Sequence, residues 1–200
     1  MVKTAGRLSA ARGEFGAELC RKGIHVLIAL VPFLAELDRS HTALLLMGGI
    51  LLYTSAESLR FLGFSPPLIS SVTVKVLRDR EKDGFALGPI TLGLGALLSL
   101  LLFPPHAAAV AVYVLAFGDS AATLVGRFFG RLRPAFLSGK SIEGSLVCFA
   151  VSAFIGFLSF QDLKTAVIIG LASMLAEAFS CKDFDNLLLP MAAGLAVLVS

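Results

Sequence analysis

The sequence predicts an all-α, polytopic integral membrane protein with about seven transmembrane helices. Hydrophobic residues make up 56% of the 200 residues and charged residues only 16%, and the mean hydropathy is +0.87. A water-soluble fold of this size cannot bury so much apolar surface. The apolar residues form long blocks between short charged stretches, and a helix needs about 20 apolar residues to cross about 30 Å of hydrocarbon. The pattern is therefore that of a helical membrane protein.

Seven apolar blocks define the predicted spans. They are Ile24 to Leu37, Ala43 to Leu62, Phe85 to Phe103, Ala107 to Phe129, Ile142 to Phe160, Ala166 to Cys181, and Leu187 to the C-terminus. The first block is short for a span, so its helix is predicted to begin near Phe15 and to bring polar residues into the interface. On that helix Glu18, Arg21 or Lys22, and His25 share one face.

The basic residues predict the orientation of the chain. Of the 17 lysines and arginines, all but Arg39 and Lys164 fall on one side of the predicted spans. The positive-inside rule places that side in the cytosol, together with the N-terminus, and an odd number of spans leaves the C-terminus outside. The same rule explains the net charge of +3 better than nucleic-acid binding does. The longer polar loops, 63–84 and 130–141, are cytosolic in this topology, so we expect the chemistry there.

Four ionisable residues lie within the apolar blocks or at their edges. An ionisable side chain inside a span costs about 2.5 to 3.5 kcal/mol on the insertion scale, so each needs a partner or a function. They are His25, Glu57, Asp119 and Glu177. All belong to the cytosolic half of the predicted topology or lie near its boundary. We therefore expect them to converge on one cytosolic-facing cleft.

Residues 117–131 combine small residues with charges. The small residues recur every four positions, at Gly118, Ala122, Gly126 and Gly130. Such a stripe lets another helix approach closely, so ordinary packing or a homodimer explains it. Packing does not need the carboxylate of Asp119, which can bind a divalent cation that bridges phosphate oxygens. Arg127 can grip a phosphate through two N–H groups.

Residues 138–145 form a lysine-bearing turn that leads into a helix with Glu143 in its first turn. Backbone N–H groups at a helix start, with Lys140, Ser141 and Ser145, make a suitable phosphate cradle. The turn is not a Walker A loop, because Pro134 stands where that motif needs a glycine. A capped helix start with Ser141 as N-cap explains the same residues equally well.

A third group of polar residues follows the sixth block. Glu177, Asp183 and Asp185 suit a second metal or nucleotide contact, or else simply a solvated loop in which Asn186 caps the last helix. The charged loop 75–84 is interpreted as a solvated segment that can also close over a nucleotide. The three cysteines are far apart, and no Cys/His cluster occurs. Disulfide frameworks and zinc hydrolysis are therefore without support.

Taken in order, these segments resemble the CTP-dependent lipid kinase family, which includes dolichol kinase, phytol kinase and CTP-dependent diacylglycerol kinase and is distantly related to phosphatidate cytidylyltransferases. The resemblance covers most of the chain. It is carried by residues 18–25 (Glu-Leu-Cys-Arg-Lys-Gly-Ile-His), 118–122 with Gly126 and Gly130, 140–145, and 185–186 before Pro190. It implies a cytosolic CTP site with a divalent cation such as Mg²⁺. The γ-phosphoryl group would pass to the hydroxyl of a membrane lipid alcohol of the diacylglycerol, polyprenol or phytol type.

The resemblance implies a single transmembrane catalytic domain over residues 1–200, in the cell membrane or, in a eukaryote, the endoplasmic reticulum. The catalytic residues would be Asp119, Lys140 and Glu143, with Glu143 orienting Lys140. The metal ligands would be Asp119 with Asp185 or Glu177. The nucleotide and its phosphates would be bound by Arg21, Lys22, Ser120, Arg127, Ser141, Ser145 and Asn186. His25 and Glu57 would border the lipid entrance.

Two other functions stay open from the residues alone. A phosphatidate cytidylyltransferase-like CDP-lipid synthase would use the same metal and basic residues, although the longer C-terminal signature of those enzymes is replaced here by Lys-Asp-Phe-Asp-Asn at 182–186. A small ion-coupled transporter would use the intramembrane carboxylates as ion sites. A scaffold without catalysis would leave the buried acids without a role. Asp119 and Glu177 are both candidates for the general base.

Overall fold

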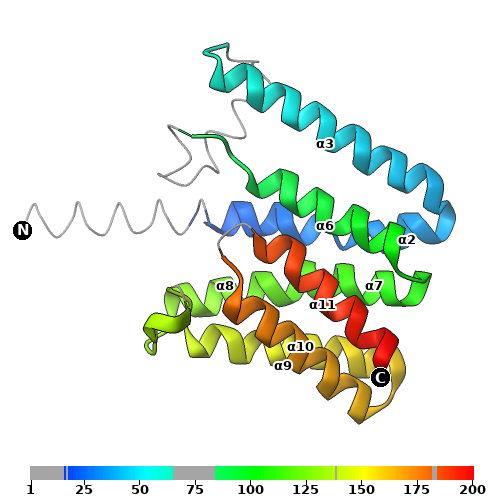
Figure 1. Ribbon diagram of the computed structural model, residues 1–200, viewed down its shortest axis with the longest axis vertical. Coiled ribbons are helices and arrows are strands. Elements are labelled where there is room, and N and C mark those ends of the chain that lie inside the picture. The colour runs from blue at the N-terminus through cyan, green and yellow to red at the C-terminus, as the bar shows by residue number, and fades with distance from the viewer. Residues whose placement is uncertain (1–15, 17, 65–83, 138, 182–183) are drawn as a thin grey trace, which may run out of the picture.

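A computed structural model describes residues 16, 18–64, 84–137, 139–181 and 184–200 of the chain. Every regular element within these ranges is helical, which confirms the all-α prediction (Figure 1). The α-helices are α2 (Leu30–Leu37), α3 (Arg39–Phe61), α6 (Gly88–Leu102), α7 (Pro105–Tyr113), α8 (Asp119–Phe128), α9 (Ile142–Phe160), α10 (Leu163–Phe179) and α11 (Asp185–Val199). Residues 18–27 are also helical, and a 3₁₀ turn covers Ala135–Leu137.

The helices pack around α7 and its continuation into α8. Neighbours α9 and α10 lie side by side, α11 packs on α10, α6 and α7, and α3 lies at one edge of the bundle against α6 and α2 (Figure 1). Val110, Val112, Val114 and Leu115 are fully buried at the centre. The many alanines of α7 leave room for neighbouring backbones. This central helix carries Asp119 into the interior of the bundle.

Within the described part of the chain, three helices are long and apolar enough to cross a membrane: Arg39–Phe61, Pro105–Phe128 and Ile142–Phe160. Shorter apolar helices cover Gly88–Leu102 and Asp185–Val199. Large hydrophobic side chains face outward, as on α3, where Leu45 and Leu52 are 70% and 71% exposed. An outward apolar surface of this extent is typical of contact with lipid. The count of seven spans and the cytosolic N-terminus stay predictions.

The first predicted span is not one continuous helix. Residues 18–27 are helical, as the predicted early start requires, but residues 28–29 form a turn and α2 begins only at Leu30. Pro32 explains the break, because its ring nitrogen cannot donate to the carbonyl four residues back and its ring crowds that carbonyl. Tighter bonds replace the helical ones, with Ile28 N donating to His25 O at 3.2 Å and Val31 N to Ile28 O at 3.0 Å. His25 therefore lies in the last turn of the helical segment 18–27.

A π-helical segment, Val114–Gly118, joins α7 to α8. The backbone N–H of Asp119 bonds to the carbonyl of Val114, five residues back. Such a segment adds a residue to the turn and changes the direction of the side chains that follow, and π-turns occur often at functional sites. The wide turn lies directly before Asp119 and decides which neighbours its carboxylate meets.

The glycine stripe of α8 packs against α9 of the same chain. A Cβ atom added to Gly126 would lie 2.9 Å from Ser141 Oγ, and one added to Gly144 would lie 2.8 Å from the backbone oxygen of Ala122. A Cβ on Gly118 would lie 3.1 Å from Ser152 Oγ. The packing explanation of the stripe is therefore correct, and the two helices approach at glycine from both sides.

Candidate functional site

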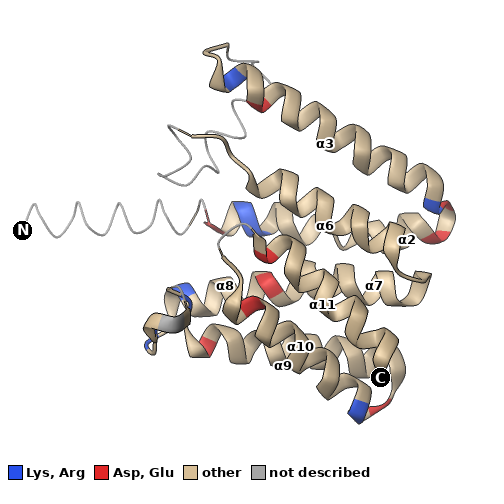
Figure 2. Cartoon of the chain, in the orientation of Figure 1, with Lys and Arg blue, Asp and Glu red and all other residues tan. Residues whose placement is uncertain are grey.

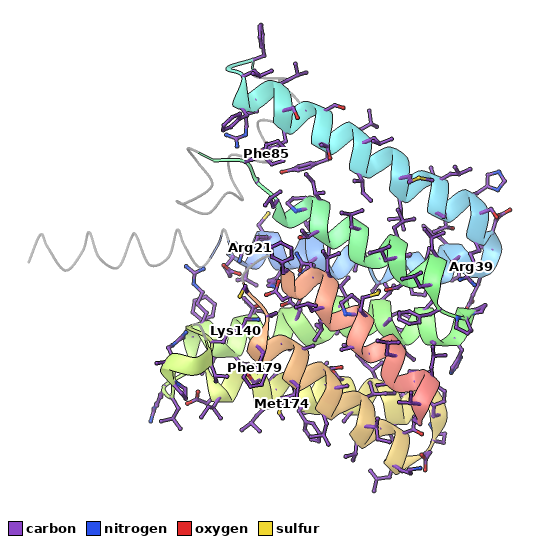
Figure 3. All side chains as sticks on the ribbon, in the orientation of Figure 1. Arg21, Arg39, Phe85, Lys140, Met174 and Phe179 are labelled. Atoms are coloured by element: carbon purple, nitrogen blue, oxygen red, sulfur yellow. The ribbon has the colours of Figure 1, made fainter. Side chains whose placement is uncertain are left out.

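Apart from Glu57 on α3, the buried charges gather at one end of the bundle, where segment 18–27, α8, the start of α9, the end of α10 and the start of α11 meet (Figure 2). Arg21 and Lys140 both lie at this end, whereas Arg39 lies at the opposite end (Figure 3). The remaining helical surface is largely uncharged (Figure 2). We call this group of side chains the charged cluster: Glu18, Arg21, Lys22, His25, Asp119, Arg127, Lys140, Glu177 and Asp185.

Asp119 is the centre of the first half of the charged cluster. Its side chain is buried, and its Oδ2 accepts a hydrogen bond from Lys22 Nζ and lies 3.0 Å from His25 Nδ1. Thr123 Oγ1 lies 3.4 Å from the other carboxylate oxygen. Lys22 and His25 are also buried and lie one turn apart on one helix face. A buried carboxylate is tolerable because it is paired in this way.

Glu18 connects the same helix to the end of α8. Its carboxylate is buried, binds Arg21, and accepts a hydrogen bond from Arg127 Nη1 at 2.5 Å. The pairing brings both predicted phosphate-binding arginines to one carboxylate. Glu18 was not among the predicted site residues, although its position on the same helix face as Lys22 and His25 was a signal that it belongs to the charged cluster.

Lys140 is the centre of the second half of the charged cluster. Its Nζ donates to Glu177 O at 2.6 Å, to Ser180 Oγ at 2.8 Å and to Asp185 Oδ2 at 3.3 Å, and lies 3.2 Å from Glu177 Oε1. Ser145 Oγ donates to Glu177 Oε2 at 2.7 Å. Both carboxylate oxygens of Glu177 are therefore occupied. Ser180, which the sequence did not single out, completes the set of acceptors around the ammonium group.

The two halves are coupled through charge. Burial by itself lowers the pKa of Lys140, but the carboxylates of Asp185, Glu177 and Asp119 outweigh burial and hold the pKa of Lys140 above its ordinary value. Lys140 is thus a permanent cation at neutral pH. The negative charge of Asp119 also stabilises the ammonium form of Lys140. Residues 119, 140 and 185, from three different parts of the chain, therefore interact electrostatically.

Asn186 docks the first turn of α11 on α6. Its Nδ2 donates to Thr91 Oγ1 at 2.9 Å and to Gly88 O at 3.2 Å. The helices are so close that a Cβ on Gly95 would lie 2.0 Å from Asn186 O. The amide predicted to contact the nucleotide is therefore used to hold α11, and with it the neighbouring Asp185, in position.

Glu143 does not orient Lys140 as predicted. Its Oε1 accepts hydrogen bonds from the backbone N–H groups of Arg131 at 2.9 Å and Leu132 at 3.1 Å. Glu143 points back to the loop after α8, whereas Lys140 reaches toward the end of α10, so the two side chains diverge. Ser141 is the N-cap of α9, with its Oγ accepting from Gly144 N at 3.1 Å, which confirms the capping explanation.

Glu57 belongs to a different set of contacts. It is buried near the end of α3, where Arg60 donates to both of its carboxylate oxygens at 2.8 and 2.6 Å and Ala86 N donates at 2.7 Å. Arg60 also donates to Gly84 O at 2.6 Å. These bonds join α3 to the stretch that precedes α6. The predicted convergence therefore describes His25, Asp119 and Glu177 but not Glu57.

Ser120 also borders Asp119. Its side chain is buried and its Oγ has no hydrogen-bond partner among the described residues. Some of the residues predicted to border the site, namely 75–83, Ser138 and Asp183, lie outside the residues that the structure describes.

The carboxylates fit a cation that arrives with phosphate. Within the described ranges there is no group of three His, Cys, Asp or Glu residues arranged to hold a metal ion. Mg²⁺ is usually bound by one or two carboxylates together with substrate phosphates and waters, so a full protein cage is not needed. Asp119 and Asp185 supply such carboxylates from opposite halves of the charged cluster. The carboxylates of Asp119, Glu177 and Asp185 all accept bonds on both oxygens, so a bound cation would replace some of these donors.

Fold and site together describe a helical protein with an apolar exterior and a buried cluster of acids and bases at one end. No protein-family model matches the sequence, and no solved structure matches it. It is 25% identical over 198 residues to CTP-dependent diacylglycerol kinase 1 of Schizosaccharomyces pombe, covering 88% of this chain and 90% of that protein. It is 31% identical over 151 residues to phytol kinase of Synechocystis sp., covering 70% and 63% respectively.

A third relative, CTP-dependent diacylglycerol kinase 1 of Eremothecium gossypii, is 33% identical over 84 residues, covering 42% of this chain and 26% of that protein. The chain is therefore similar over most of its length to a CTP-dependent diacylglycerol kinase and to a phytol kinase. The resemblance carried by its motifs is confirmed at that level.

Proposed function

We propose that the protein is a lipid kinase that transfers the γ-phosphoryl group of CTP to the hydroxyl of a membrane lipid alcohol. Two relatives carry names that state a kinase of diacylglycerol and a kinase of phytol, which are both primary alcohols on apolar tails. The observation that carries the proposal is the charged cluster, in which Lys140 and Asp185 touch and Asp119 acts on the same ammonium.

Phosphoryl transfer is mainly a matter of positioning and charge neutralisation. Lys140, Lys22 and Arg127 supply cationic groups from three elements for the oxygens of a triphosphate. Asp119 and Asp185 would hold the divalent cation, which when bound neutralises charge on the β and γ phosphates. Because Lys22 and Lys140 would exchange carboxylate partners for phosphate oxygens, each buried ammonium keeps an anionic partner throughout.

The lipid substrate would approach from the side of the bundle. Ile24 and Leu27, beside His25 on segment 18–27, are 41% and 61% exposed, and Leu188 near the start of α11 is 49% exposed. These side chains present an apolar surface next to the charged cluster. A lipid alcohol can lay its tail on that surface while its hydroxyl, which lies near the membrane interface, reaches the charges.

Labelled nucleotide tests the proposal. The purified protein in detergent is given Mg²⁺ and CTP labelled at either the γ or the α phosphorus, together with diacylglycerol, a polyprenol, phytol or phosphatidic acid. We expect γ-label in at least one lipid alcohol and no α-label in any lipid. α-Label in phosphatidic acid would instead support the CDP-lipid synthase, and the absence of label in every lipid would contradict the kinase.

A further inference from the structure

The carboxylate of Glu18 lies behind two arginines. Its side chain is 2% exposed, whereas the side chains of Arg21 and Arg127 are 23% and 39% exposed. Arg21 donates to it from the same helical segment and Arg127 from the last turn of α8, so the two contacts come from different elements. A guanidinium carries five N–H donors in a rigid fork. A buried carboxylate therefore fixes each fork while part of each arginine stays exposed.

The neighbouring pair of Lys22 and Asp119 is enclosed instead. Their side chains are only 7% and 3% exposed. Glu18 precedes Lys22 by four residues on the same helical segment, which is about 6 Å along the helix axis. The charged cluster therefore has an enclosed ammonium group beside Asp119 and, about one helical turn away, a pair of accessible guanidinium groups.

Packing alone does not explain a carboxylate at position 18. Burying an ionised group is unfavourable unless charged partners compensate for it. Without Glu18, two like charges would lie close together on two long side chains with many rotamers. A binding site is stronger when its side chains are already held in the bound arrangement. Two guanidinium groups and one carboxylate also leave a net positive charge, which suits an anionic ligand.

We propose that Glu18 is a positioning residue that fixes Arg21 and Arg127 as a paired clamp for the nucleotide phosphates, an inference that rests on the proposed kinase function. The clamp lies about one turn from Asp119, where the cation and the γ-phosphate would be held. It therefore binds the α and β phosphates, which CTP shares with its product CDP. Both arginines keep Glu18 when the nucleotide binds. No bond to phosphorus forms or breaks at the clamp, so Glu18 sets the affinity for the nucleotide and not the rate of transfer.

The first experiment is Glu18→Gln in the γ-label assay, with CDP as inhibitor. The change keeps the shape of the side chain and removes its charge, so ordering the two arginines becomes part of binding. We expect the KM for CTP and the inhibition constant of CDP to rise together by about 5–150-fold, with kcat within about threefold of wild type. The KM for the lipid alcohol should not change. A CDP inhibition constant that falls, or rises by less than about fivefold, overturns the inference.

Glu57→Gln is the matched control. Glu57 is also a buried glutamate that pairs with an arginine three residues later, Arg60, but it lies on α3 outside the charged cluster. Both variants lose a buried ion pair, so both should have a lower unfolding temperature, and a merely structural effect appears in both. Only Glu18→Gln should need more CDP to raise its unfolding temperature, a readout that requires no turnover. Equal weakening of CDP binding in the two variants overturns the inference.

A Glu18→Gln protein that does not fold is replaced by Glu18→Asp, which keeps the charge but draws the carboxylate back from the arginines. It should also weaken CDP binding by at least about fivefold at an unchanged kcat, and wild-type affinity for CDP would overturn the inference. A wild-type protein that transfers no γ-label contradicts the kinase, while the unfolding temperatures with CDP still decide the role of Glu18. A wild-type protein whose unfolding temperature CDP does not raise overturns both.

Discussion

Lys140 Nζ lies 3.3 Å from Asp185 Oδ2, although 45 residues separate the two in the chain. The lysine leaves the turn before α9 and the carboxylate begins α11, so the contact exists only because α9, α10 and α11 pack side by side. With Glu177 and Ser180 it gives one ammonium group four acceptor atoms. In the proposed reaction this ammonium would face the phosphates.

Replacing Lys140 by methionine keeps the length of the side chain and removes its charge. We expect label transfer to fall by about 10²–10³-fold, as for the loss of one preorganised donor to developing charge. The free energy of unfolding should also fall by on the order of 3 kcal/mol, because Glu177 and Asp185 lose the ammonium group that pairs with both of them. Thermal unfolding and γ-label transfer in detergent measure the two effects.

The matched control for that change is Lys164→Met, an exposed lysine at the start of α10. It should alter neither activity nor stability by a measurable amount. If the Lys140→Met protein transfers label as fast as wild type, Lys140 has no role in the proposed phosphoryl transfer.

The same lysine predicts a dependence of stability on pH. Its pKa in the folded protein lies above the ordinary value of 10.5, because three carboxylates outweigh the effect of burial. A raised pKa means that the ammonium stabilises the fold fully below the ordinary value, and that this contribution is lost as the pH rises through the folded value. The difference in unfolding temperature between wild type and Lys140→Met should therefore be constant from neutral pH upward and shrink only above about pH 10.5. A difference that shrinks near neutral pH would contradict the assignment.

Removal of divalent cations should abolish label transfer, and added Mg²⁺ should restore it. If Asp119 contributes an oxygen to the cation, Asp119→Asn lowers transfer by about 10²–10³-fold and shifts the remaining activity to higher Mg²⁺ concentration. Glu36→Gln, a change at an exposed acid on α2, serves as control and should follow the wild-type Mg²⁺ curve. Transfer that persists in excess chelator would exclude the proposed role of the cation.

The approach of α8 to α9 makes Gly144 sensitive to a single methyl group. A Cβ there would lie 2.8 Å from the backbone oxygen of Ala122, which has little freedom to move. We expect Gly144→Ala to destabilise the protein by about 1–3 kcal/mol. Gly49→Ala on α3 has no atom within 4 Å of the new Cβ and should be neutral or stabilising by up to about 1 kcal/mol. Thermal unfolding of the two variants checks this, and equal effects would contradict the packing.

The positions of the helices were predictable from the sequence, because length, hydropathy and capping are local properties. The predicted block Ile142 to Phe160 coincides with α9, and the block Ala107 to Phe129 covers α7 from its third residue, the π-segment and α8. The insertion cost of ionisable residues also singled out His25, Asp119 and Glu177 correctly as buried. Pro32 is the sequence signal for the turn at residues 28–29, although the predicted first span runs across it without a break.

The pairing of the buried charges, by contrast, became known from the packed helices. Lys22 and Asp119 touch across 97 residues, and Asn186 and Thr91 across 95, so no local spacing could indicate these pairs. The same applies to Glu143, whose carboxylate binds loop amides, and to the π-turn that directs Asp119. Local propensity selects the elements, but a buried charge takes its partner from whichever helices the apolar packing brings beside it, and that choice depends on the whole chain.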